Sequence, residues 1–242
     1  MTANKVFPSF AEAVKDVPNG AVIFMDGFGG PGGMPRYLIL ALREQGAKNL
    51  TVVANTAGIA SAVGFGTPPG QQAVDLGVLI ESGQVRKVIA SFPASPSPSR
   101  PNAFEKLYRQ GKIELELVPQ GTLAERIRAG GAGIPAFYTP TGAGTLIAQG
   151  KETRVFNGRE YLLERALRAD YAFVWALKAD TLGNLMYKGT SRNFNAVMAT
   201  AARITIAEVD QIVEPGEIDP DMVHTPGIFV KRIVQRPRQA RL

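Results

Sequence analysis

The sequence contains no cysteine and only one histidine, His224, among its 242 residues. The missing thiols exclude disulfides, thiolate metal sites and a cysteine nucleophile. With one histidine, we expect neither a histidine-rich metal site nor a Ser-His-Asp triad within the chain. The sequence also lacks an apolar run close to the roughly 20 residues that span a bilayer, and it opens with no signal-peptide pattern. We therefore expect a cytoplasmic protein with no metal site and no membrane partner.

Neither aromatic nor charged residues are enriched, at 8% and 20% of the chain against 45% apolar residues. This composition is typical of a soluble globular protein. The net charge is +6, but the basic residues are interleaved with acidic ones and form no basic face with aromatic spacing. We therefore expect no nucleic-acid partner. We predict a single domain over residues 1–235, followed by a basic, disordered tail over 236–242.

Glycine is abundant, and its densest group lies between residues 19 and 35. Residues 21–25 form a short apolar run bounded by turn residues, which predicts a strand buried on both faces. The glycines that follow permit positive φ and let a ligand approach the backbone amides; they are Gly27, Gly29, Gly30, Gly32 and Gly33. Pro35 suits the first turn of a helix. A strand, a glycine loop and a helix N-terminus together predict an anion-binding corner.

Three interpretations of this corner are open. A tight turn would need the glycines for its geometry alone. A dinucleotide fold would use Gly27 to Gly32 as its G-x-G-x-x-G pattern. However, that fold requires an acidic residue at the end of the next strand, and the predicted strand 50–54 is followed by Asn55. The third interpretation is a coenzyme A pocket, for which the rest of the chain must decide.

Alternating strands and helices in the first half predict an α/β fold with a mainly parallel sheet. The second half adds antiparallel strands, because Asn157-Gly158 between residues 152–156 and 159–163 is a strong hairpin signal. The other predicted strands are 50–54, 85–90, 113–117, 171–176, 203–213 and 228–234. The predicted helices are a short one from a capping box at 9–12, then 35–45, 71–82, 102–110, one from a capping box at 122–125 to Gly130-Gly131, and 193–202.

Several stretches together carry a family pattern. They are Pro119-Gln-Gly-Thr-Leu-Ala-Glu-Arg at the start of residues 119–142, Lys178-Ala-Asp180, Gly183-Asn184, Arg192-Asn-Phe-Asn195 and Thr225-Pro-Gly-Ile-Phe229. With them, residues 10–234 resemble the alpha chain, also called the A subunit, of the class I coenzyme A transferases. This is the 3-oxoacid type, which includes succinyl-CoA:3-ketoacid and 3-oxoadipate enzymes. The resemblance implies a three-layer α/β fold of the NagB/RpiA type, with a mainly parallel sheet and antiparallel additions in the second half.

The resemblance also implies a mechanism, in which a glutamate attacks an acyl-CoA thioester to give an anhydride and then an enzyme-bound CoA thioester. In this family the glutamate lies in the beta chain, or B subunit, and its Glu-Asn-Gly motif is absent from this sequence. The chain is therefore expected to act only with a B subunit, in a heterodimer or heterotetramer. Its expected substrates are an acyl-CoA such as succinyl-CoA and a small carboxylic acid, with coenzyme A as a substrate and no permanently bound cofactor.

The resemblance assigns catalysis to Gln120 and Asn55, and coenzyme A binding to Gly27, Phe28, Gly29, Gly30 and Thr56. The Gln120 amide can donate to a carbonyl oxygen that gains negative charge in the transition state. Asn55 can do the same or hold the substrate carboxylate. The structural alternatives are a helix-capping role for Gln120 and an Asx-turn for Asn55. Trp175 and His224 are assigned to structure.

The sequence departs from the family pattern at the glycine loop. Asp26 replaces the first glycine of Gly-Gly-Phe-Gly, the loop before Met34-Pro35 is one residue longer, and the usual Asn-Asn pair is Asn55-Thr56. A carboxylate at Asp26 would repel an anionic substrate unless it is protonated or paired. Alternative functions on the same fold are therefore an acyl-CoA hydrolase, a ring-cleaving enzyme, a decarboxylase or a non-catalytic CoA-binding subunit.

Overall fold

A computed structural model describes residues 4–25, 28, 32–64 and 73–237. Its main sheet has eight strands, with β11-β10-β8-β1-β2-β3-β4 in spatial order and β9 attached to β8. All pairs along that order are parallel, and β9 runs antiparallel to β8. The strands are β1 (Val22–Met25), β2 (Leu50–Val53), β3 (Val85–Ala90), β4 (Glu114–Leu117), β8 (Ala169–Asp180), β9 (Leu185–Met186), β10 (Ala202–Val213) and β11 (Val230–Gln235).

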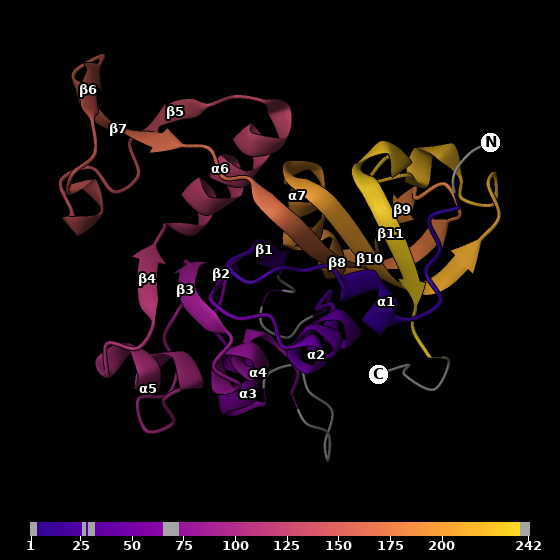
Figure 1. The fold of residues 1–242 in the computed structure, drawn as a ribbon. Helices are drawn as coiled ribbons and strands as arrows, with labels where there is room; N and C mark the ends of the chain where they lie inside the picture. The colour runs from indigo at the N-terminus through magenta and orange to yellow at the C-terminus, as the bar shows by residue number, and fades with distance from the viewer. Residues whose placement is uncertain (1–3, 26–27, 29–31, 65–72, 238–242) are drawn as a thin grey trace.

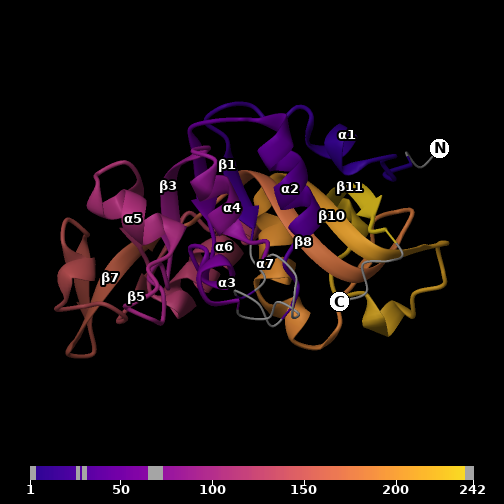
Figure 2. The ribbon, with the colours of Figure 1, turned by 90° about the horizontal axis from the view of Figure 1, so that it is seen from below.

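Helices cover both faces of this sheet, so the predicted three-layer α/β architecture is confirmed (Figure 1). One layer holds α1 (Phe10–Val14), α2 (Arg36–Gln45), α3 (Ile59–Val63), α4 (Leu76–Glu81) and α5 (Ala103–Arg109); the other holds α6 (Gln120–Ala132) and α7 (Asn193–Ala201). Figure 2 shows the same layers from below. Four short 3₁₀ helices complete the described elements: η1 (Leu146–Ala148), η2 (Gly189–Arg192), η3 (Pro220–Met222) and η4 (Gly227–Phe229).

Each buried strand supplies both cores, because successive side chains point to opposite faces. Ile23 of β1 and Val52 of β2 pack in the core under α2 and α4. The next residue of each strand, Phe24 and Val53, packs in the core under α6 and α7. This explains why the strands read as continuous apolar runs rather than as alternating patterns.

A separate antiparallel sheet, which we call the arm (residues 136–165), projects from the main body (Figure 1). Its order is β5-β7-β6, with β5 (Ala136–Thr139), β6 (Thr153–Phe156) and β7 (Arg159–Arg165). The predicted hairpin turn is confirmed: Asn157 and Gly158 have φ of +50° and +76° between β6 and β7. Two consecutive residues with positive φ are what a two-residue hairpin turn requires.

Two helices begin more than one residue away from the predicted position. The helix predicted over 71–82 begins only at Leu76, where the Asp75 carboxylate accepts a hydrogen bond from Gly77 N at 2.9 Å; residues 71–72 lie outside the described residues. The capping box predicted at 122–125 is wrong, because α6 begins at Gln120 after Pro119. The helix ends at Ala132, and Gly133, with φ of +75°, is its C-cap. Proline fixes its own φ and lacks an N–H, so it can precede a helix without a capping side chain.

Gly130 and Gly131, predicted as the stop of this helix, instead permit close packing of α6. A Cβ on Gly130 would overlap the carbonyl oxygen of Leu167, and one on Gly131 would lie 2.5 Å from Thr200 Oγ1. Gly130→Ala is therefore expected to lower the free energy of unfolding by about 1–3 kcal/mol, as measured by urea denaturation. The control is Gly121→Ala in the same helix, where a Cβ meets nothing within 4 Å. Equal stability of the two variants would contradict this packing role.

The predicted tail begins too early. Arg236 Nε binds the carboxylate of Glu208, and Arg236 Nη2 donates to Met34 O at 3.1 Å. Arg232, four residues before the predicted tail, lies in β11 and forms a bidentate ion pair with Asp16. Residues 238–242 lie outside the described residues. The single-domain prediction for residues 1–235 stays a prediction.

Candidate active site

The predicted site residues lie after neighbouring strands, on the side of the main sheet where these parallel strands have their carboxyl ends. Asn55 and Thr56 come after β2, Phe92 after β3 and Gln120 after β4. Because β1 to β4 are parallel, their carboxyl ends meet at the same edge, where open α/β sheets place ligands. The backbone oxygen of Asn55 accepts from Phe92 N at 2.8 Å, and Thr56 forms a parallel bridge with Phe92. The segments that follow β2 and β3 are therefore joined by backbone hydrogen bonds.

Gln120 and Asn55 are in contact through their side chains. Gln120 Nε2 donates to Asn55 Oδ1 at 2.9 Å across 65 positions of sequence. Asn55 is only 2% exposed, whereas Gln120, the first residue of α6, is half-buried. The amide of Gln120 therefore bonds to another strand end, and α6 has no side-chain cap at its N-terminus. A primary amide nitrogen carries two hydrogens, so Gln120 has a second one to donate.

Two buried hydroxyls in the segments that carry or contact this amide pair have no hydrogen-bond partner in the described structure. They are Ser91 Oγ, just after β3, and Thr122 Oγ1, in the first turn of α6. Folded proteins satisfy nearly all buried polar atoms, and the exceptions often belong to functional sites. Both atoms flank the strand ends that carry Asn55 and Gln120.

Phe28 is the described residue between the end of β1 and Gly32. Its φ is +57°, which is unusual for a residue with a side chain. Its ring is 38% exposed and stacks on Phe194 of α7, with the ring centroids 6.1 Å apart. Gly27, Gly29 and Gly30 lie outside the described residues, as does Asp26. The coenzyme A role of these residues, of Phe28 and of Thr56 stays a prediction.

The end of the glycine stretch is held by Asn195, to which the sequence assigned no role. Asn195 is fully buried, and its Nδ2 donates to Gly33 O at 3.0 Å and to Ser191 O at 2.9 Å. Its Oδ1 accepts from Trp175 N at 3.1 Å. Gly33 has φ of +89°, and a Cβ there would lie 2.6 Å from Asn195 Nδ2. The asparagines of the 192–195 stretch were the available signal, but the Gly33 O that Asn195 binds lies 162 positions away in sequence.

The predicted anion-binding corner is wrong in one respect: the N-terminus of α2 already holds a carboxylate of this chain. Glu208 of β10 is fully buried and accepts from Tyr37 N at 2.8 Å and Leu38 N at 3.0 Å. Arg36 N donates to Met34 O at 2.9 Å. These are the first-turn donors that an anionic ligand would need. The α2 N-terminus is therefore closed to a substrate anion.

The Glu208 carboxylate is neutralised by Arg236. Burial raises the pKa of Glu208 above its usual value, and the Arg236 guanidinium opposes that shift. Arg236 also lies 5.5 Å from the ring centroid of Trp175, whose Nε1 donates to Asp210 at 3.0 Å. His224 Nδ1 accepts from Tyr187 N at 3.0 Å. Trp175 and His224 thus both make contacts within the fold, as the sequence predicted.

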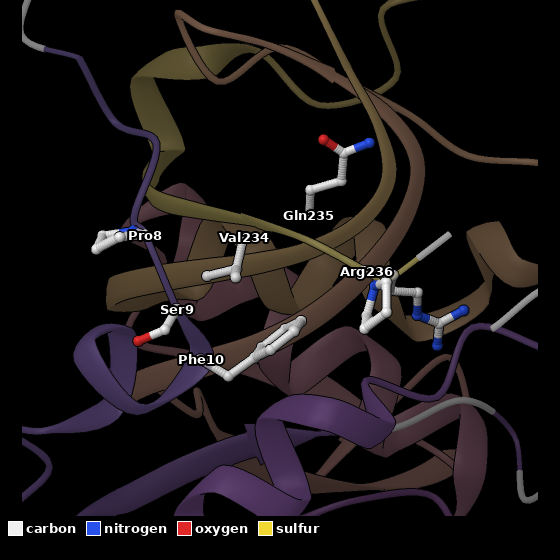
Figure 3. A pocket seen from close by; sticks show the side chains of 7 residues that line it. Pro8, Ser9, Phe10, Val234, Gln235 and Arg236 are labelled. Atoms are coloured by element: carbon white, nitrogen blue, oxygen red, sulfur yellow. The ribbon is translucent and has the colours of Figure 1, made fainter. Parts of the chain in front are cut away.

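A cleft of about 430 Å³ lies elsewhere, between residues 8–10 and the end of β11 (Figure 3). Four of its seven lining residues are apolar, and the side chain of Arg236, which also lines it, is bound by Glu208. It lies at the β11 edge of the sheet, on the far side of β10 and β8 from β1. In the part of the chain that the structure describes, no three His, Cys, Asp or Glu side chains group as a metal site. No helix there combines the length and apolar character needed to cross a membrane.

The sequence is similar to known proteins over most of its length. Residues 7–236 match the family model described as coenzyme A transferase. The chain is 50% identical over 230 residues to the A subunit of the probable succinyl-CoA:3-ketoacid coenzyme A transferase of Bacillus subtilis, covering 95% of this chain and 89% of that protein. It is 49% identical over 231 residues to the A subunit of the 3-oxoadipate CoA-transferase of Pseudomonas putida, covering 96% and 93%.

Among solved structures, the acyl-CoA transferase YdiF of Escherichia coli O157:H7, in a thioester complex with CoA, superposes with a TM-score of 0.77 at 25% identity. The match covers 98% of this chain and 48% of that one, so this chain spans about half the length of that enzyme. The chain belongs to the coenzyme A transferase family. The family that the sequence motifs indicated is therefore confirmed.

Proposed function

We propose that this chain is the A subunit of a heteromeric CoA-transferase that moves CoA from an acyl-CoA, such as succinyl-CoA, to a 3-oxoacid. The relatives at 49–50% identity are named as A subunits of enzymes for such acids. In this proposal the attacking glutamate comes from a B subunit. This chain supplies the Gln120–Asn55 amide pair, with coenzyme A bound as a substrate.

The observation that carries the proposal is the hydrogen bond from Gln120 to Asn55 at the strand ends. Asn55 is buried and held by the backbone of residues 91–92, so it fixes the position of the Gln120 amide. A fixed donor needs little reorganisation when a carbonyl oxygen becomes negatively charged. The unpartnered hydroxyls of Ser91 and Thr122 support a site that receives further oxygen atoms from a substrate or water.

In the proposed chemistry, this chain stabilises each addition to a carbonyl group. The partner's carboxylate adds to the thioester carbonyl, and the C–S bond then breaks to release CoA thiolate and leave an acyl anhydride. The thiolate attacks the glutamyl carbonyl of the anhydride and expels the first acid. The 3-oxoacid then reverses both steps and leaves as its CoA thioester. Each addition places negative charge on a carbonyl oxygen, which the second hydrogen of Gln120 Nε2 stabilises.

Gln120→Ala is expected to lower kcat of the complete heteromer by about 10²–10³-fold, the usual cost of losing one oxyanion donor. The assay follows the new acyl-CoA formed from succinyl-CoA and a 3-oxoacid, with ping-pong kinetics. The matched control is Gln110→Ala, an exposed glutamine after α5. A Gln120→Ala complex that turns over at the control rate would remove Gln120 from catalysis. Release of free CoA or of CO₂ without a new acyl-CoA would instead indicate hydrolysis or decarboxylation.

A further inference from the structure

The arm carries a cluster of aromatic side chains on one face. The Phe156 ring of β6 makes edge contacts with Tyr138 of β5 and Tyr161 of β7, with centroid distances of 5.4 and 5.3 Å. The strand register explains why these three rings lie on the same face of the arm. Phe156 pairs with Arg159 and Tyr138 with Leu163, which are two residues to either side of Tyr161 on β7. Side chains two apart on a strand point to the same face.

The rest of the described chain leaves part of this aromatic face exposed, with Tyr138 and Tyr161 half-buried. All four residues of β6 are exposed, and Phe156 is 42% exposed. The Arg154 guanidinium lies 5.4 Å from the ring centroid of Tyr138, on the same face. Tyrosine, phenylalanine and arginine are enriched at the centres of protein interfaces. The three-stranded arm therefore has exposed aromatic side chains that are suited to packing against another protein surface.

The position of the arm indicates which surface that is. Figure 1 shows β4 leading into α6 and the arm beyond it, on the side to which β4 points. This is the side that carries Gln120 at the start of α6. A second polypeptide that docks on the arm therefore lies on the same side of the main sheet as the amide pair. In YdiF, this chain matches 48% of a single polypeptide, so slightly more than half of that transferase lies outside the matched part.

We propose that the aromatic face of the arm, formed by Tyr138, Phe156, Tyr161 and Arg154, is the docking surface for the B-type CoA-transferase subunit. This inference rests on the proposed function, because that function requires a second polypeptide at Gln120. The arm holds this partner against the strand ends, and its aromatic side chains become buried in the heteromer.

The test measures association of the purified chain with the B-type subunit of the same organism, by calorimetry without substrate. Phe156→Asp and Arg154→Glu are expected to raise Kd at least about 30-fold, as interface hot spots do. The matched control is Val155→Asp, because Val155 lies on the opposite face of the same strand and is 68% exposed. It is expected to change Kd less than about 3-fold, as a residue outside the contact does. Melting curves check that each variant is folded, and Arg154, with a 64% exposed side chain, keeps the test valid if Phe156→Asp does not fold.

Equal affinity of Arg154→Glu and the parent chain would overturn the proposal, as would a larger loss for Val155→Asp. No association of the parent chain with the B-type subunit would also overturn it. So would a homodimer of the chain alone that Arg154→Glu dissolves, because the face would then serve a second copy. A complex that depends on the arm but transfers no CoA would contradict the proposed function and leave the docking surface intact.

Discussion

Replacement of Arg236 by methionine is expected to lower the free energy of unfolding by about 3–5 kcal/mol, the usual cost of breaking a buried ion pair. Its partner Glu208 is fully buried at the N-terminus of α2, where it accepts from two backbone N–H groups. Without the guanidinium, the carboxylate keeps these donors but loses its counter-charge. Arg236→Met also removes the hydrogen bond to Met34 O at 3.1 Å.

The control for this variant is Arg109→Met, because Arg109 pairs with Glu105 at 3.6 Å with 69% of its side chain exposed. Exposed pairs contribute about 0–1 kcal/mol. Thermal or urea unfolding of both variants measures the difference. If Arg236→Met were no less stable than Arg109→Met, the buried pair would not stabilise the fold.

The pH dependence gives this prediction a second readout. Burial raises the pKa of Glu208 above its unfolded value, so the folded state binds this proton more tightly than the unfolded state does. The associated stability is present below the unfolded pKa and is lost as the pH rises through the folded pKa. Removal of Arg236 raises the folded pKa further, because the counter-charge is gone. Arg236→Met should therefore recover stability relative to the parent chain as the pH falls, and Arg236→Met/Glu208→Gln should recover it at neutral pH.

Asn195→Leu is expected to lower the free energy of unfolding by about 3–5 kcal/mol. The variant leaves three backbone groups without a partner, and each unsatisfied buried polar group costs about 1–3 kcal/mol. Leucine has a similar size but leaves Trp175 N, Gly33 O and Ser191 O without the bonds that Asn195 makes. All three groups lie around a fully buried side chain. The change also frees Gly33 at the end of the glycine stretch.

The control is Asn193→Ala in the same helix, because Asn193 is only half-buried; its Nδ2 donates to Thr190 O at 2.8 Å in an exposed bond and to Gly32 O at 3.3 Å. We expect it to cost about 1 kcal/mol. Urea denaturation compares the two variants, and KM for the acyl-CoA in the complex reports on the loop. Similar losses for both variants would show that Asn195 does not hold the loop in place.

The layered α/β fold follows from the amino-acid sequence, because the signals that specify it are local. Apolar runs of four or five residues specify buried parallel strands, and Asn157-Gly158 specifies the turn of the arm, since few residues accept positive φ. The motifs from residue 119 onward identified the family, and with it Gln120 and Asn55. These assignments need only neighbouring residues or a resemblance, so no knowledge of distant contacts was required.

The pairing of buried polar groups could be learned only from the three-dimensional arrangement of the chain. β8 lies between β1 and β10, and this arrangement brings Glu208 to the α2 amides and Asn195 to Gly33, over separations of 170 and 162 positions. The same sheet order sets Gln120 against Asn55. The sequence of a helix N-terminus does not show whether a ligand or a buried side chain binds there, because the backbone N–H donors are identical in both cases. The tertiary structure therefore shows that Glu208 occupies the N-terminus of α2. The strand ends beside Gln120 remain as the candidate site.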